Sequence, residues 1–169
     1  MAYQVPRMDP VESRAWLALI GTAELLPTAL DAQLQADSGM THFEFMVLSA
    51  LTRTSGKRMR LTDLAASVNA TLPRLSKVVT RLDARGLVQR SAASDDRRAV
   101  DVRLTADGRR AIVRATPGHI ARVRQLVIDR LDVEQLTALA DALEPVVAAL
   151  DPQRRMRPLL QGPDDEAPH

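Results

Sequence analysis

Arginine and lysine gather in one stretch of this 169-residue chain. Residues 53–114 contain 15 Lys and Arg against 6 Asp and Glu, whereas the rest of the chain contains 8 against 15. Guanidinium and ammonium groups donate hydrogen bonds to phosphate oxygens and to guanine O6 and N7. The charge pattern therefore predicts a polyanion-facing module joined to a neutral or acidic body, although a solvated surface would also account for it.

The residues between 61 and 105 predict the elements that would position these cations. A first helix is followed by a turn at Asn69-Ala70 and by a basic helix with Thr71 as its cap and Pro73 in its first turn. Gly86 is predicted to end that helix, and strands over 87–91 and 99–104 would form a basic hairpin. A helix-turn-helix followed by a charged β-ribbon is a shape that reads duplex DNA. The apolar side of the basic helix would be formed by Leu75, Val78, Val79 and Leu82.

The flanking segments are also predicted to be helical. A helix over 10–37 would kink or break at Pro27, and Thr41 with Glu44 would cap a helix ending near 51. A polar connection spans 52–60, and Thr62 or Asp63 would cap the helix after it. Thr105 would cap a helix reaching about 131 with an interruption at Pro117-Gly118, and a last helix over 133–150 would bend at Pro145. These outer helices carry more apolar surface than a small winged helix can cover, which indicates pairing with a second chain.

Composition restricts the remaining classes of function. Aromatic residues make up 2% of a chain that is 46% hydrophobic, so aliphatic packing and helices are favoured. The absence of cysteine excludes disulfides and thiolate metal sites. No apolar run is long enough to span a membrane, and the N-terminus lacks the layout of a signal peptide, so we predict a cytoplasmic protein without membrane partners. The chain shows no glycine-rich phosphate loop, zinc-helix motif or nucleophile elbow, so no catalytic residue and no cofactor are predicted.

Four fragments in order resemble the MarR family of winged-helix transcription regulators: MTHFEFMVLSAL, LTDLAASV, PRLSKVVTRLDARGLV and DDRRAVDVRLTADG. The resemblance implies a mainly α fold with a small β-hairpin wing, in which a winged helix-turn-helix is flanked by N- and C-terminal dimerisation helices. The resemblance covers a MarR-like domain over 10–150. Residues 1–9 are predicted to be a flexible arm, and the tail over 151–169 is predicted to be disordered because it holds four prolines and many charges. Within the domain, the winged helix covers about 40–111 and the dimerisation helices about 10–37 and 112–150. The resemblance further implies a homodimeric regulator, a repressor or an activator, on a pseudo-palindromic DNA operator. We predict a repressor that a small aromatic effector releases from DNA.

The candidate DNA contacts lie on the basic helix and on the hairpin tip. Four residues of the basic helix are candidates for contact with base edges in the major groove: Arg74, Ser76, Lys77 and Arg81. Each of them could instead contact a phosphate or only solvent. For Arg81, contact with a phosphate is favoured. The family pattern implies that Asp96 orients Arg98 for the minor groove and that Arg97 contacts phosphate, whereas a solvated loop is the alternative. Before the first helix of the module, a basic cluster formed by Arg53, Lys57, Arg58 and Arg60 is either a phosphate clamp or a soluble loop.

The resemblance also implies an effector pocket bordered by Trp16, His42, Phe45 and Met46. Packing in the dimer core is the alternative for Trp16 and Phe45, and a surface or capping role is the alternative for His42. The three histidines, His42, His119 and His169, show no metal-ligand spacing, so no metal site is predicted. Two other classes of function stay open: a winged helix that serves only as a protein-interaction scaffold, and an enzyme.

Overall fold

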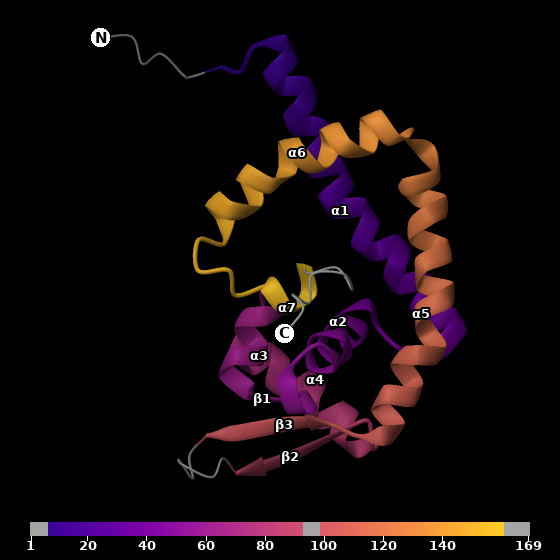
Figure 1. The fold of residues 1–169 in the computed structure, drawn as a ribbon, viewed down its shortest axis with the longest axis vertical. Helices are drawn as coiled ribbons and strands as arrows, with labels where there is room; N and C mark the ends of the chain where they lie inside the picture. The colour runs from indigo at the N-terminus through magenta and orange to yellow at the C-terminus, as the bar shows by residue number, and fades with distance from the viewer. Residues whose placement is uncertain (1–6, 93–98, 161–169) are drawn as a thin grey trace, which may run out of the picture.

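A computed structural model describes residues 7–92 and 99–160. In Figure 1 a small sheet lies at one end of the molecule beside three short helices, and two long helices lead away from it toward a helix that crosses the other end. The elements follow in the order α1 (Pro10–Ser38), α2 (His42–Thr52), η1 (Ser55–Lys57), β1 (Arg58–Arg60), α3 (Leu61–Ser67), α4 (Leu72–Ala84), β2 (Val88–Ala92), β3 (Val100–Leu104), α5 (Ala106–Leu126), η2 (Ile128–Arg130), α6 (Val133–Leu150) and α7 (Arg157–Leu160). The predicted mainly helical fold with a small winged sheet is confirmed.

Local signals in the sequence set several helix ends. The Thr41 side chain accepts a hydrogen bond from the Glu44 backbone N–H at 3.0 Å, and the Glu44 carboxylate accepts one from the Thr41 N–H, which confirms the predicted capping box. Gly39 ends α1 with φ of 60°, and Gly86 follows α4 with φ of 69°. Glycine adopts this left-handed conformation without the steric cost that a Cβ brings.

The core forms where the apolar side of α4 meets α2, α3 and the sheet. All four residues predicted for that side of α4 are buried, as is most of α2. Full burial of a Leu or Val side chain contributes about 1.5–3 kcal/mol, so this cluster fixes the position of α4 in the fold. The fully buried side chains include Leu34, Met40, Val47, Leu48, Leu51, Leu64, Leu75, Val79, Leu82, Val88 and Val102.

The sheet has three antiparallel strands in the order β1-β3-β2. β2 and β3 correspond to the predicted hairpin, but β1 falls in the segment expected to be only a polar connection. Three residues are too few to show the alternation of a strand, and β1 is defined by its pairing with β3, in which Met59 lies opposite Val102. Asp101 of β3 is buried although it is charged, and its carboxylate lies 3.6 Å from Arg58 Nε across the pair β1–β3.

The predicted break at Pro27 and the predicted interruption at Pro117-Gly118 were wrong, because α1 and α5 each continue through the internal proline. α6 also continues through Pro145, where a bend was predicted. A proline removes one helical hydrogen bond by leaving the carbonyl four residues earlier without its donor. The residue four positions before each proline is exposed. The internal prolines are Pro27 in α1, Pro117 in α5 and Pro145 in α6.

The predicted caps of α3 were also wrong. Arg60 occupies the N-cap position and makes no side-chain cap hydrogen bond, because β1 leads directly into the helix. Thr71 does hold the N-cap position of α4, but its side chain forms no cap hydrogen bond either.

The segment after α6 was predicted to be disordered, and for residues 151–160 this was wrong. The buried Asp151 carboxylate accepts a hydrogen bond from the Met156 N–H at 2.8 Å and lies 3.1 Å from Arg155 Nε. α7 then packs beside α2 and α3, where Arg53 Nη1 donates to the Leu159 carbonyl at 3.2 Å. Sequence composition could not reveal this order, because it depends on contacts with helices about a hundred residues earlier.

The outer helices leave apolar side chains uncovered within the described part of the chain. No residue of α6 is buried, and in α1 only Leu30 and Leu34 are. Over residues 7–92 and 99–160, no helix combines the length and apolar character required to cross a bilayer. The exposed large apolar residues of α1 and α6 are Val11, Trp16, Leu17, Leu19, Ile20, Leu25, Val133, Leu139, Val146, Val147 and Leu150.

Gly108 allows the start of α5 to approach the sheet closely. A Cβ built at Gly108 would overlap the Leu87 carbonyl oxygen and lie 2.7 Å from Leu104 Cδ1. Thr105 caps α5 as predicted, accepting from the Gly108 N–H at 3.0 Å, and its hydroxyl lies 2.7 Å from the Gly86 carbonyl oxygen. The first turn of α5 is thus fixed against the end of α4 and the start of β2.

Replacing Gly108 with alanine should therefore lower the free energy of unfolding by about 1–3 kcal/mol, because the backbone must move to admit the methyl group. Urea denaturation followed by circular dichroism measures the change. Arg109→Ala, at the next and exposed position of α5, is the control and should change stability by less than about 0.5 kcal/mol. Equal stability of Gly108→Ala and the native chain would contradict the close contact.

Candidate functional site

The outer side of α4 presents a row of cations. Arg74, Lys77 and Arg81 are exposed and spaced three and four residues apart, so they lie along one side of the helix, while Ser76 is half-buried on another side. The three cations border a hollow of about 510 Å³ together with Phe43 of α2 and Asp31 of α1. The structure therefore brings three of the four predicted α4 residues to one concave surface.

Arg74 lies against an aromatic ring from the neighbouring helix. Its Cζ atom is 4.4 Å from the centroid of the half-buried Phe43 ring, which is within the range of a cation–π interaction. The sequence alone indicated only that Phe43 belongs to the apolar side of α2. No sequence pattern could have paired the two residues, because the contact depends on how α2 and α4 cross.

A single buried carboxylate connects the first turn of α2 with the last turns of α4. Glu44 Oε1 lies 3.5 Å from Arg81 Nε, and Glu44 Oε2 lies 3.3 Å from Arg85 Nη1. The arginine side chains are 57% and 40% exposed, so each ion pair alone contributes little to stability. Since Glu44 also closes the cap of α2, its side chain is held on three sides. The predicted DNA candidate Arg81 is thus also part of an interhelical ion pair.

The other side of α4 is connected to the wing. Arg90 Nη1 of β2 donates to Thr80 Oγ1 at 2.9 Å, and the Thr80 hydroxyl donates to the Ser76 carbonyl at 2.9 Å. These bonds join the middle of α4 to β2. The predicted tip residues Asp96, Arg97 and Arg98 lie outside the described residues.

The basic cluster before α3 is divided among several environments. Arg58 pairs with Asp101 within the sheet, and Arg53 donates to the Leu159 carbonyl near α7. Lys57 is half-buried at the end of η1, with φ of 52°. Arg53 and Arg58 therefore contribute to the fold whether or not they also contact a polyanion.

His42, Phe45 and Met46 meet in a second hollow, with a volume of about 520 Å³. The opposite wall comes from α5, through Ile112, Thr116 and His119. One end is formed by Met156 and Leu159, residues of the segment that was expected to be disordered. The surface combines apolar walls with imidazole groups and Arg53 at its edge, which suits a small molecule with an aromatic ring and an acidic group.

His119 is the main residue of this hollow that the sequence did not assign to it. Its ring centroid lies 4.4 Å from that of Phe45 and 5.9 Å from that of His42. Burial lowers the pKa of His119 below its usual value, and the nearby His42 lowers it further; burial also lowers the pKa of His42, with a smaller opposing effect from Asp31. Both imidazoles are therefore held toward their neutral form, and the buried His119 Nδ1 has no hydrogen-bond partner among the described residues.

Trp16 does not join these residues. It lies in the N-terminal half of α1 with 48% of its surface exposed, and it is absent from the lining of the hollow. α1 meets α2 through its C-terminal half, where Leu30 and Leu34 are buried. The predicted grouping with His42, Phe45 and Met46 does not occur within one chain, because Trp16 lies more than three helical turns before these contacts.

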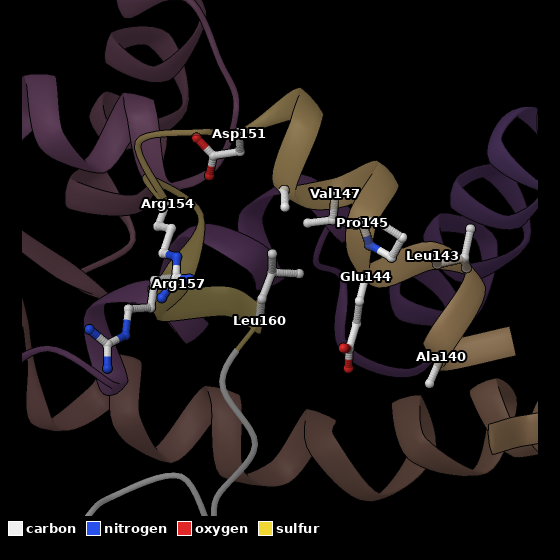
Figure 2. A pocket seen from close by; sticks show the side chains of 10 residues that line it. Ala140, Leu143, Glu144, Pro145, Val147, Asp151, Arg154, Arg157 and Leu160 are labelled. Atoms are coloured by element: carbon white, nitrogen blue, oxygen red, sulfur yellow. The ribbon is translucent and has the colours of Figure 1, made fainter. Parts of the chain in front are cut away.

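A third hollow, of about 810 Å³, lies between α6 and the segment after it. Figure 2 shows Leu143 and Val147 on α6 and Leu160 on α7, with Glu144 on one side and Arg154 and Arg157 on the other. Its α6 wall is part of the apolar surface that the described chain leaves uncovered.

The fold is that of a winged helix-turn-helix protein, with α3 and α4 as the helical pair and β2–β3 as the wing. The MarR family model matches residues 40–100. The structure resembles Sco3205, a MarR family transcriptional regulator from Streptomyces coelicolor solved in complex with DNA. The TM-score is 0.82 with 36% sequence identity, covering 89% of this chain and 94% of that one.

A second solved structure gives a similar result. AbsC, a MarR family transcriptional regulator also from Streptomyces coelicolor, aligns with a TM-score of 0.80 and 34% identity, covering 88% of this chain and all of that one (100%). A repressor named YetL, an HTH-type transcriptional repressor of Bacillus subtilis (strain 168), is 25% identical over 100 residues, which are 59% of this chain and 60% of that protein's length.

The chain belongs to the MarR family of transcriptional regulators. The family consists of regulators and not of enzymes, which confirms the prediction that this chain is not an enzyme.

Proposed function

We propose that the protein is a cytoplasmic, homodimeric repressor that binds a pseudo-palindromic operator in double-stranded DNA. The observation that carries the proposal is the exposed row of Arg74, Lys77 and Arg81 on a helix whose opposite side is buried in the core. A helix of this kind enters the major groove, where Arg and Lys contact guanine edges and phosphates. The DNA complex of Sco3205 and the repressor YetL support DNA binding and repression by similarity.

The wing would complete the contact with the duplex. Asp96, Arg97 and Arg98 lie between β2 and β3 in the sequence. In this proposal Arg98 enters the minor groove, Asp96 orients it, and Arg97 contacts a phosphate; narrow minor grooves attract arginine through their negative potential. The bond between Arg90 and Thr80 supports a fixed direction of the strands relative to α4. Ser76, half-buried beside Thr80, would reach a phosphate or a base edge.

The outer helices supply the surface for a second subunit. In α6, Leu139, Leu143, Val146 and Leu150 are spaced so that they share one side of the helix, and none of them is buried. Exposed apolar surface of this extent is rare on monomers and typical of interfaces. We therefore infer that α1, α6 and the later part of α5 pair with a second copy around a two-fold axis, which places the two α4 helices on one face of the dimer.

A small aromatic acid would regulate the protein by binding between α2 and α5. The support is the hollow lined by His42, Phe45, Met46 and His119, where a buried Nδ1 without a partner among the described residues lies next to an aromatic ring. Trp16 is not part of this site within one chain and belongs to the proposed dimer interface instead.

The proposal predicts that Arg74→Ala and Lys77→Ala each weaken DNA binding. The probe is the duplex that the native protein enriches from a randomised pool, and fluorescence anisotropy measures the dissociation constant. Removal of one bidentate hydrogen-bonded pair with guanine should reduce affinity about 5- to 150-fold, the equivalent of roughly 1–3 kcal/mol. Where a variant leaves one phosphate without its cation, the slope of log affinity against log salt should become shallower by about one.

Arg114→Ala is the matched control, because it removes the same charge from an exposed position near the middle of α5, outside both α4 and the later part of α5. This variant should bind the duplex as the native chain does. If Arg74→Ala and Lys77→Ala also bind every duplex normally, α4 is not the DNA-reading helix and a protein-interaction scaffold becomes the better interpretation.

The dimer can be tested by placing a charge on the apolar side of α6. Sedimentation equilibrium of the native chain should give about twice the monomer mass of 18.5 kDa. Leu139→Asp should shift the protein toward the monomer, since burial of an unpaired carboxylate costs several kcal/mol. Thr137→Asp, on the opposite side of α6, should leave the dimer intact. A native chain that sediments as a monomer at micromolar concentration would refute the proposal.

The effector proposal predicts that benzoic or phenolic acids raise the melting temperature of the native protein. Binding at one hundred times the dissociation constant stabilises a fold by about 2.7 kcal/mol. His119→Leu should remove most of this shift, whereas Arg109→Ala, at an exposed position outside this hollow, should retain it. The same shift in native protein and His119→Leu would place the ligand elsewhere.

A further inference from the structure

We propose that Phe43 is a positioning residue for sequence recognition: it holds Arg74 of α4 in place for reading a base. This inference rests on the proposed DNA-binding function and adds a determinant of specificity that lies outside the helix-turn-helix itself. It starts from the contact between the Arg74 Cζ atom and the Phe43 ring, at 4.4 Å from the ring centroid.

The contact restricts Arg74 without using its hydrogen-bonding groups. An aromatic ring attracts the positive charge of a guanidinium through the negative face of its π system. The five N–H donors stay available, and two of them suffice for a bidentate contact with guanine O6 and N7. The structure records no side-chain hydrogen bond or ion pair between Arg74 and another described residue. A long side chain held in this way gives up less rotamer freedom when it binds a base.

Phe43 can hold Arg74 only if α2 is itself fixed relative to α4. Two ion pairs connect these helices, and one further hydrogen bond attaches α2 to α1. The His42 N–H donates to Asp31 Oδ1 at 2.8 Å, which connects the first turn of α2 to α1. Glu44, the next residue after Phe43, connects the same turn to Arg81 and Arg85 at the other end of α4. The first turn of α2 is therefore attached to both ends of the proposed recognition helix.

The position of the ring agrees with this role. Phe43 is half-buried, packs on the edge of the core and borders the hollow that also contains Arg74, Lys77 and Arg81. Its neighbour Phe45 is buried and faces His119 instead. Phe43 therefore contacts the core and also borders the cationic surface.

The test is a double-mutant cycle on DNA binding. The probes are the duplex that the native protein enriches from a randomised pool, its single-base variants, and a scrambled duplex. Phe43→Leu keeps the apolar volume but removes the π face, and it should weaken binding to the enriched duplex about 5-fold, with little change on the scrambled one. Phe43→Tyr retains the ring and should bind within about twofold of the native protein. In an Arg74→Ala background, Phe43→Leu should cause no further weakening.

Several results would overturn the positioning role. One is a Phe43→Leu variant with the affinity and base preference of the native protein. Another is a Phe43→Leu variant whose binding is weakened equally on the enriched and the scrambled duplex. A third is the same loss of affinity from Phe43→Leu in the native and the Arg74→Ala background. Thermal melts accompany each variant, and Phe43→Met replaces Phe43→Leu if the latter lacks a cooperative melt. A native protein that enriches no sequence overturns the proposed function and this inference together, whereas a binding native protein with an unaffected Phe43→Leu overturns only the inference.

Discussion

Burial of the apolar side of α4 decides where its charged residues lie. Leu75, Val78, Val79 and Leu82 enter the core, so the residues between them must face outward. The cost of exposing these four side chains exceeds what the exposed ion pairs around α4 could contribute. The helix is therefore held by its apolar side, and its cationic side is left to interact with another molecule.

α2 contributes residues to both candidate sites, the cationic surface of α4 and the hollow against α5. From one turn, Phe43 and Glu44 reach arginines of α4, while His42, Phe45 and Met46 line the hollow against α5. A side chain on α2 cannot shift far without disturbing either its cap or its contacts with α4, because the packed interior resists gradual deformation. A ligand between α2 and α5 would thus act on the same helix that supports the cationic surface.

The outer helices bury much less of their apolar surface than the winged helix does. The winged helix contains most of the buried core, whereas α6 contains no buried residue and α1 leaves most of its N-terminal half exposed. The charges are distributed in a similar way, because the stretch with a net positive charge, residues 53–114, includes α4 and the wing. Covering α6 requires a second surface of matching apolar character, and in the proposed dimer a second copy of the chain would supply it by symmetry.

The sequence by itself determined the features that depend on neighbours along the chain. The capping box at Thr41 and Glu44, the glycine after α4, the apolar period of α4 and the hairpin strands all rest on local backbone and side-chain geometry, and all are confirmed. The tertiary structure decided the rest. β1 forms because it pairs with β3, and α7 is placed by its packing against α2 and α3. Phe43 meets Arg74 because α2 and α4 cross. Such contacts join residues that are far apart in sequence, so no periodicity records them. The helices also continue through their prolines, although a proline removes one helical hydrogen bond, and the residue four positions before each proline is exposed in the packed fold.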